Sequence, residues 1–132
     1  MASNYYKPCA ELSECDRLIE EYFLKGQYEE CFKGHLRLAE KGYPLAECQT
    51  GYFYHEGLGV EKDLEKSFYY TECAARHGDR DAQFNLANWF YEPGVIVENN
   101  IEEAHAWYKK AAMQGQSNAM EYCKNHGIAY GD

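Results

Sequence analysis

The sequence predicts an all-α protein in which pairs of helices stack side by side. Three observations support this prediction. The chain repeats itself at a spacing of about 36 residues, each copy carries apolar residues at helical spacing, and helix-starting and helix-ending residues recur at fixed places. A period of roughly 20 to 50 residues indicates a repeat architecture, in which each unit buries its apolar face against its neighbours.

The two clearest copies are residues 45–81 and 82–118. Equivalent positions hold similar residues: Ala46 and Ala82, Gly51 and Ala87, Tyr54 and Phe90, Val60 and Val97, Ala74–Ala75 and Ala111–Ala112, Gly78 and Gly115. Residues 13–44 form a shorter copy, and residues 119–132 begin another as a capping helix. We therefore expect one repeat domain over residues 1–132, in which residues 1–12, with the start "MASNYYKP", form a tail or an added helix edge.

The first helix of each copy is predicted from an apolar stripe at positions i, i+4 and i+8, which share one face of a helix. The stripe consists of Ala46, Thr50 and Tyr54 in one copy, and of Ala82, Leu86 and Phe90 in the other.

The second helix of each copy is predicted to begin after an N-cap residue. Asp63 and Asn100 stand directly before amphipathic segments, where their side chains can accept hydrogen bonds from unpaired backbone N–H groups. Asn100 and Glu103 also have the spacing of a capping box. Ser13 is a third cap candidate, before the first helix of the shorter copy. The second helices are expected to end at left-handed glycines, namely Gly42, Gly78 and Gly115.

The stretch Gly57-Leu58-Gly59-Val60 lies between the two predicted helices of one copy. A dinucleotide-binding loop would need a third glycine and a preceding strand, and both are missing. We therefore interpret the stretch as a bend between helices, in which at least one glycine adopts positive φ and tolerates alanine poorly.

The run Ala46, Gly51, Tyr54-x-x-Gly57-x-Gly59-Val60, Asp63, Lys66, Ala74–Ala75, Gly78 resembles the Sel-one-like repeat, a relative of the tetratricopeptide repeat. The resemblance covers about residues 14–125, and the shorter copy at 13–44 is similar to a tetratricopeptide unit. Two features depart from the family pattern: Thr50 stands where leucine is usual, and the second loop has the sequence "EPGVIV". The resemblance implies a right-handed α-solenoid of about seven helices that serves as a non-enzymatic scaffold or adaptor, binding a protein or peptide in its concave groove.

The resemblance also implies which residues line that groove, because the first helices of such repeats face the concave side. Carried over by position, the candidate partner-binding residues are Asp16, Glu20, Phe23, Cys48, Tyr52, His55, Glu56, Phe84, Asn88, Tyr91, Glu92, Glu121 and Asn125. They combine aromatic rings, amides and carboxylates, a mixture that suits the binding of a peptide.

The formal net charge of −9 argues against nucleic-acid phosphates and anionic membranes as partners. It fits a basic protein partner, and it also fits a charge that serves solubility alone. A more specific alternative is an acidic immunity-type protein that neutralises a basic toxin, since charge complementarity speeds association. We expect a cytoplasmic protein, because the sequence contains neither a signal peptide nor an apolar run long enough to span a membrane. We also expect a monomer.

Candidates for chemistry are weak. Cys123-x-x-His126 has a metal-like spacing but lacks a second pair of ligands, and His55-Glu56 is not a zinc motif because Gly59 replaces the second histidine. A thiol-dependent enzyme is the remaining alternative, although Cys73 lies beside Glu72, which disfavours a thiolate. The sequence therefore predicts no enzyme activity, no metal and no cofactor.

Overall fold

The computed structural model describes residues 9–131 except 93 and 95, with side chains described from residue 13 on. The tail or added helix edge predicted for residues 1–12 lies partly outside this range, since residues 1–8 are not described, whereas residues 9–12 belong to the first helix. The described residues form no strand. They fold into seven α-helices and a short 3-10 helix: α1 (Cys9–Glu21), η2 (Phe23–Lys25), α2 (Tyr28–Glu40), α3 (Pro44–Glu56), α4 (Leu64–Arg76), α5 (Arg80–Tyr91), α6 (Ile101–Met113) and α7 (Ser117–Asn125).

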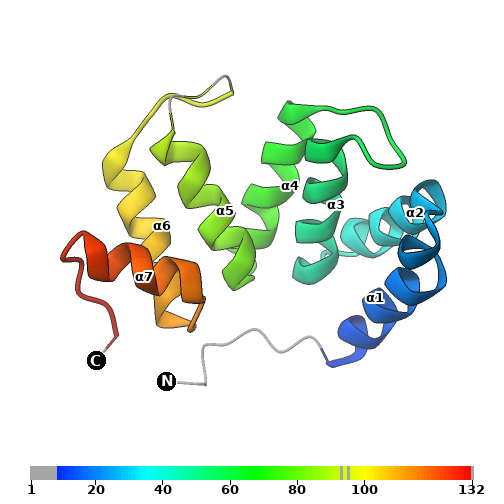
Figure 1. Ribbon diagram of the computed structural model, residues 1–132, viewed down its shortest axis with the longest axis horizontal. Coiled ribbons are helices and arrows are strands. Elements are labelled where there is room, and N and C mark those ends of the chain that lie inside the picture. Colours follow the sequence, from blue (N-terminus) through cyan, green and yellow to red (C-terminus); the bar gives the residue numbers. More distant parts are fainter. Residues whose placement is uncertain (1–8, 93, 95, 132) are drawn as a thin grey trace.

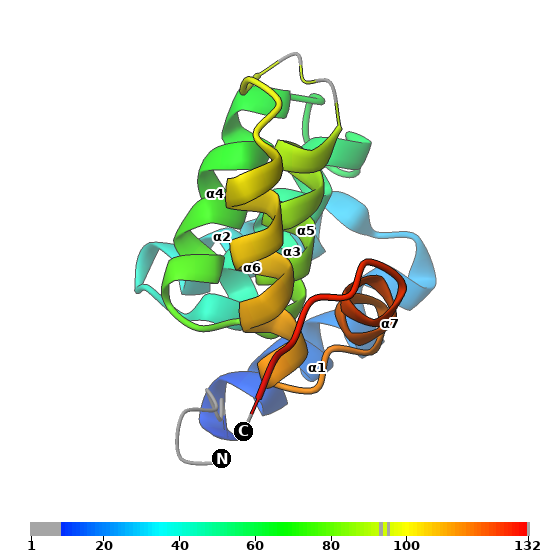
Figure 2. The same cartoon turned by 90° about the vertical axis from the view of Figure 1, so that its left-hand side faces the viewer.

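Consecutive helices pack against one another along the molecule (Figure 1). Figure 2 shows two layers, with α3, α5 and α7 on one side and α2, α4 and α6 on the other. The predicted all-α solenoid of helix pairs is thus confirmed. Among the described helices, none is both long and apolar enough to cross a membrane.

Small residues allow the helices of this stack to approach closely. The alanines at the helix crossings are almost fully buried: Ala46, Ala74, Ala75, Ala82, Ala87, Ala104, Ala111, Ala112 and Ala119. Larger side chains such as Phe53, Leu86 and Tyr108 fill the space between these contacts. The two predicted stripes follow this pattern, since all their residues are buried except Phe90, which is half-buried. Burial of these apolar surfaces is the main force that holds the repeats together.

The caps of the second helices agree with the prediction. The side chain of Asp63 accepts a hydrogen bond from the backbone nitrogen of Lys66 at 3.0 Å, and that of Asn100 accepts one from Glu103 at 3.1 Å. The Glu103 carboxylate instead accepts from the indole of Trp107.

The predicted cap at Ser13 is wrong. Helix α1 begins at Cys9, so Ser13 lies within the first helix. The helix extends beyond the repeat pattern from which its start was estimated. The sequence reasoning also missed two caps, since the side chains of Asp79 and Gln116 accept from the backbone nitrogens of Ala82 and Ala119.

Replacing Asp63 by alanine is expected to lower the free energy of unfolding by about 1 kcal/mol, because the backbone N–H of Lys66 loses its acceptor. Asp63→Asn is the matched control, since its amide oxygen can still accept this bond. Urea denaturation followed by circular dichroism measures both variants. Equal stabilities of the alanine and asparagine variants would contradict the capping role.

The loop between α3 and α4 turns through two left-handed glycines, with φ of 69° at Gly57 and 68° at Gly59. The sequence predicted that at least one of the two glycines adopts a positive φ, and both of them do. The glycines expected to end the second helices also have positive φ, at Gly42, Gly78 and Gly115. The turn through Gly57 and Gly59 places the C-terminal end of α3 beside the start of α4, at one end of the groove described next.

Candidate binding groove

A pocket with a volume of about 490 Å³ lies between α3, α4 and α5. It is lined by Gly51, Tyr52, His55, Leu64, Ser67, Thr71, Asn85, Asn88, Trp89, Glu92 and Gly94. Helices α3 and α5 form its walls, and the first half of α4 forms its floor. It combines apolar and aromatic side chains with a few polar groups, as small-ligand and side-chain pockets usually do.

The pocket is open because two small side chains stand where the next repeat has tyrosines. Thr71 is equivalent to Tyr108, and Asn85 is equivalent to Tyr122. Between α5 and α7, Tyr108 and Tyr122 stack with ring centroids 3.8 Å apart and fill the corresponding space. The two grooves thus share one backbone plan, and side-chain volume decides which of them is open.

The floor of the pocket is held together by a direct contact between α3 and α4. The buried hydroxyl of Ser67 donates a hydrogen bond of 2.8 Å to the backbone carbonyl of Gly51. Gly51 permits this close approach, since a Cβ there would lie 2.9 Å from the side-chain oxygen of Thr71. The floor is therefore a rigid part of the helix packing.

Two aromatic side chains dominate the walls. Tyr52 on α3 is 46% exposed, and Trp89 on α5 is half-buried. The indole ring of Trp89 makes T-shaped contacts with His55, at a centroid distance of 6.2 Å, and with Phe68, at 5.6 Å. These contacts hold the ring in one orientation at the pocket edge.

The amide of Asn88 is oriented by a buried tyrosine. The hydroxyl of Tyr108 donates a hydrogen bond to the side-chain oxygen of Asn88. Burial raises the pKa of Tyr108, so the hydroxyl stays protonated and remains a donor. Because the oxygen of Asn88 is occupied in this way, its NH₂ group is the part left to donate to a ligand.

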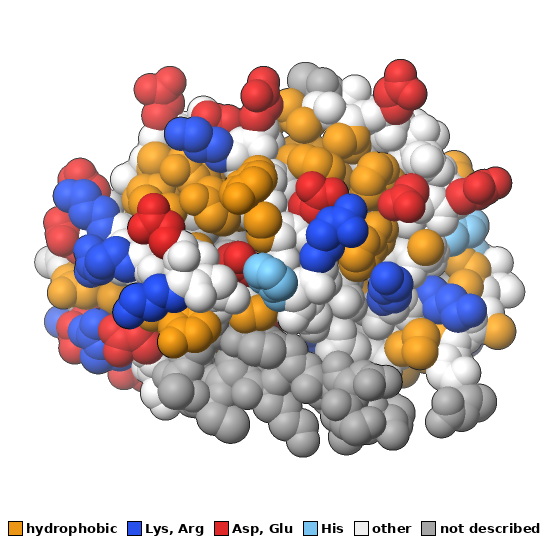
Figure 3. Space-filling view, turned by 180° about the vertical axis from the view of Figure 1, so that it is seen from behind, with side chains coloured by type: hydrophobic (Ala, Val, Ile, Leu, Met, Phe, Trp, Pro, Cys, Tyr) orange, Lys and Arg blue, Asp and Glu red, His pale blue; other side chains and the backbone are white. Residues whose placement is uncertain are grey.

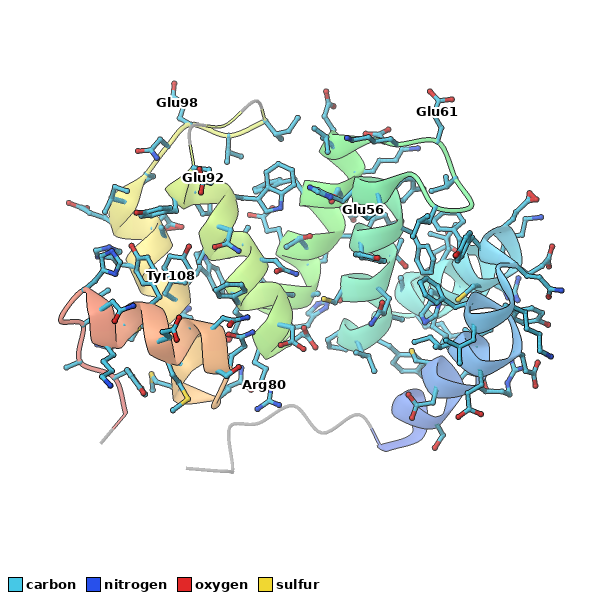
Figure 4. All side chains as sticks on the ribbon, viewed as in Figure 1. Glu56, Glu61, Arg80, Glu92, Glu98 and Tyr108 are labelled. Carbon is cyan, nitrogen blue, oxygen red and sulfur yellow. The ribbon has the colours of Figure 1, made fainter. Side chains whose placement is uncertain are left out.

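Acidic residues gather at one end of the groove. Figure 4 shows Glu56, Glu61, Glu92 and Glu98 toward the end where α3 and α5 terminate, whereas Arg80 lies at the other end. The imidazole Nδ1 of His55 lies 2.7 Å from a carboxylate oxygen of Glu56. No lysine or arginine is among the described residues that line the pocket. The pocket lining thus includes one carboxylate, that of Glu92, and a second, that of Glu56, lies beside it.

The predicted groove residues fall into three groups. Tyr52, His55, Asn88 and Glu92 line the pocket, and Glu56 lies exposed beside it. Phe84 and Tyr91 instead pack on Tyr108, with centroids 5.7 and 6.3 Å apart, so they belong to the closed groove between α5 and α7. The remaining candidates also lie away from the pocket: Asp16 and Glu20 are exposed on α1, Phe23 packs on Phe53, Cys48 is half-buried on α3, and Glu121 and Asn125 are exposed on α7.

The sequence reasoning missed Asn85 and Trp89 on the wall and Leu64, Ser67 and Thr71 on the floor. A signal for the wall was present, because Asn85, Asn88 and Trp89 stand at i, i+3 and i+4 and so share one face of α5, and Glu92 continues this spacing at i+7 as the C-cap.

Four of the described cysteines lie in surroundings that disfavour thiol chemistry. Burial raises the pKa values of Cys31, Cys48, Cys73 and Cys123, which favours the unreactive protonated thiol. Within the described part of the chain, no group of three or more His, Cys, Asp or Glu side chains is arranged to hold a metal ion. His126, half of the metal-like pair, stacks on Tyr122 with a centroid distance of 3.9 Å.

The opposite face of the molecule lies over the second helices and looks different. Figure 3 shows apolar, acidic and basic side chains interspersed on this face. Tyr69 on α4 is 58% exposed. It stands two positions along the chain from both Ser67 and Thr71, which is about half a turn of the helix, so it lies on the side of α4 turned away from the pocket.

These observations define the class of the protein, an α-solenoid of helix pairs with a groove on its first-helix side. Residues 44–79 and 80–116 each match the family model of the Sel1 repeat. The chain belongs to the Sel1 repeat family, whose members are generally protein–protein interaction modules.

Two solved structures are similar to this chain. The crystal structure of a Sel1 repeat protein from Oxalobacter formigenes has a TM-score of 0.74 and 33% sequence identity, over 89% of this chain and 47% of that one. The crystal structure of c5321, a protective antigen present in uropathogenic Escherichia coli strains that displays an SLR fold, has a TM-score of 0.67 and 30% identity, over 79% of this chain and 23% of that one. The chain thus spans less than half the length of either protein. None of the proteins with curated descriptions matches the sequence.

Proposed function

We propose that this protein is a non-enzymatic interaction module that binds an extended segment of a protein partner in the groove between α3 and α5. The observation that carries the proposal is the pocket itself, in which one groove of the solenoid is open while the equivalent groove between α5 and α7 is filled by Tyr108 and Tyr122. Membership of the Sel1 repeat family supports the proposal, since such repeats generally serve protein–protein interaction.

The chemistry of the lining fits a peptide. The NH₂ group of Asn88 can donate to a backbone carbonyl of the ligand, and the exposed ring of Tyr52 offers apolar area with little conformational freedom to lose. Such aromatic anchors carry much of the energy in protein interfaces. Side chains from two helices thus contribute to one binding surface that is already formed in the free protein.

A peptide selection tests the proposal. A phage-displayed library of random peptides is selected on the immobilised full chain, and the affinities of synthetic copies are measured by calorimetry. Asn85→Tyr should weaken binding by about tenfold or more, because the new ring occupies the pocket as Tyr122 occupies the next groove. Tyr52→Ala should weaken it similarly, by loss of an aromatic anchor.

Tyr69→Ala is the matched control, since it also removes an exposed tyrosine but from the opposite face. It should leave the affinity unchanged. If the selected peptides bind both groove variants as tightly as the wild type and lose affinity with Tyr69→Ala, the binding surface is the opposite face and the proposal fails.

A further inference from the structure

We propose that the pocket between α3 and α5 receives an arginine side chain of the partner, with its guanidinium group against Trp89 and the carboxylate of Glu92. The inference rests on the proposed function, because it names the side chain that the groove selects. It follows from three features of the pocket: its aromatic walls, its charge, and the ring and carboxylate that border it at the end of α5.

The aromatic walls suit a cation. Tyr52 and Trp89 both line the pocket, and T-shaped contacts with His55 and Phe68 hold the indole in place. A cation over the face of a tryptophan or tyrosine ring is attracted by the negative potential of that face, and tryptophan gives the strongest such contact. An apolar side chain of a ligand could also pack against these rings, so the charge around the pocket decides between an apolar and a cationic ligand.

The surroundings favour positive charge. Glu92 lines the pocket, Glu56 lies beside it, and α3 and α5 both end here, where the negative ends of the helix dipoles favour cations. The positive end of α4 lies here too, but the Asp63 carboxylate caps it.

The basic groups nearby leave the site open to a ligand. His55, the only basic side chain of the described lining, pairs with Glu56. The ammonium of Lys66, on the first turn of α4, lies 5.5 Å from the centroid of the Tyr54 ring, and Tyr54 does not line the pocket. Lys62 lies on the adjoining loop, where its Cβ faces Gly57. Glu92 is the carboxylate of the described pocket lining, and a cationic ligand can pair with it.

The arrangement at the end of α5 selects arginine over lysine. Trp89 lies on the last turn of α5, and Glu92 is the C-cap that follows the helix, its backbone N–H still bonded to the carbonyl of Asn88. Both side chains line the same pocket, so the ring and the carboxylate border one cavity. A guanidinium group is planar, stacks on aromatic faces and presents a fork of N–H donors to a carboxylate, so one arginine can use both groups. A lysine ammonium is a compact and strongly hydrated charge that gains less from the ring.

The test uses the full chain labelled with ¹⁵N and the probe peptide acetyl-Gly-Arg-Gly-amide, followed by NMR up to about 10 mM, where even weak contacts are measurable. The indole N–H resonance of Trp89 should shift and saturate. That of Trp107 is an internal control, because its indole donates to Glu103 on α6. The same peptide with citrulline, which is neutral but similar in shape, should bind at least about tenfold more weakly. The lysine peptide should bind more weakly than the arginine peptide.

Variants locate the charge contact. Glu92→Gln should weaken binding of the arginine peptide by about five- to tenfold, through loss of the charge-assisted hydrogen bonds. Glu98→Gln removes the same charge from a residue outside the pocket lining and should have little effect. An arginine peptide that does not shift the Trp89 resonance, or a citrulline peptide that binds equally well, overturns the inference.

The random-peptide selection separates this outcome from failure of the proposed function. Selected peptides that lose affinity with Asn85→Tyr but contain no required arginine would overturn the arginine site and leave the interaction module standing. Selected peptides that ignore both groove variants would overturn the proposed function together with the inference. Selected peptides whose binding disappears when one arginine is replaced by citrulline would support both.

Discussion

Gly59→Ala is expected to lower the free energy of unfolding by about 3 kcal/mol, for two reasons that add. Gly59 has a φ of 68°, a left-handed conformation that costs an L-residue about 1 kcal/mol or more. In addition, a Cβ at this position would overlap the carbonyl group of Tyr28 and lie 2.5 Å from the backbone nitrogen of Glu29. Both obstacles are backbone atoms at the start of α2, so relief requires the loop and the helix to move apart.

Two further glycines separate the conformational cost from the steric one. At Gly26, φ is 76° and a Cβ would meet nothing within 4 Å, so Gly26→Ala should cost only about 1 kcal/mol. At Gly57, φ is 69° and a Cβ would lie 3.2 Å from the Cβ of Lys62, so Gly57→Ala should fall between the other two.

Urea denaturation of the three variants gives the order directly. The order Gly59, Gly57, Gly26 is expected, with Gly59→Ala about 2 kcal/mol less stable than Gly26→Ala. Equal losses at all three positions would show that the contact between the loop and α2 contributes nothing, and would contradict the steric argument.

The repeat plan of this chain was predictable because it depends on local and periodic signals. Asp63 and Asn100 act on backbone groups three residues away, so their position in the sequence suffices to identify them as caps. The left-handed glycines Gly57 and Gly59 follow from the same short-range logic. The cap predicted at Ser13 was wrong because α1 begins at Cys9, before the repeat pattern starts. No periodic signal in the sequence marks that part of the helix.

The groove was only half predictable, because its two walls come from different sides of equivalent helices. The residues equivalent to Tyr52 and Glu56 in the next repeat are Asn88 and Glu92, and both of these line the same pocket. The same shift leads from Cys48 to Phe84, which faces the next groove and packs on Tyr108. A residue carried over to the next repeat lies on the same face of the equivalent helix. The second wall of a groove, however, is formed by the opposite face of that helix, which positional carry-over does not identify.

Side-chain volume adds a second element that the repeat pattern does not carry. Thr71 and Tyr108 occupy equivalent positions, as do Asn85 and Tyr122, yet one pair leaves a pocket and the other closes it. The function proposed for the groove therefore depends on positions at which the two repeats of this chain carry side chains of different volume. This explains why recognition of the family predicts a binding surface in general and leaves the location of its pocket to the structure.

Asp79→Asn is expected to stabilise the protein at neutral pH, which is unusual for a change at a helix cap. Asp79 is only 7% exposed, and its carboxyl accepts a hydrogen bond from the backbone nitrogen of Ala82 at 2.8 Å. Burial raises its pKa to about 6, and the nearby charge of Asp81 acts in the same direction, whereas the bonds from Ala82 and Cys48 act against the rise. The ionised carboxylate is therefore held in a site that penalises its charge.

The sign of the pH dependence follows from comparing the folded pKa with the unfolded value of about 3.9. Since the folded pKa is the higher one, the folded chain binds this proton more tightly, and the stability it confers is lost as pH rises from about 4 to 6. A shift of roughly two units corresponds to about 3 kcal/mol above pH 6, as an upper bound. Asparagine keeps the acceptor for the Ala82 N–H and cannot ionise.

The measurement is the difference in unfolding free energy between Asp79→Asn and the wild type, from urea titrations at several pH values between 4 and 7.5. This difference should grow with pH in favour of the variant and level off above about pH 6 to 7. Burial lowers the pKa of His35 and destabilises the fold toward acid, but His35 is present in both proteins and cancels in the difference. Asp81→Asn removes an equal charge from the exposed neighbour and should show a much smaller pH-dependent gain. A difference that does not change with pH would mean that Asp79 ionises as freely in the folded chain as in the unfolded one.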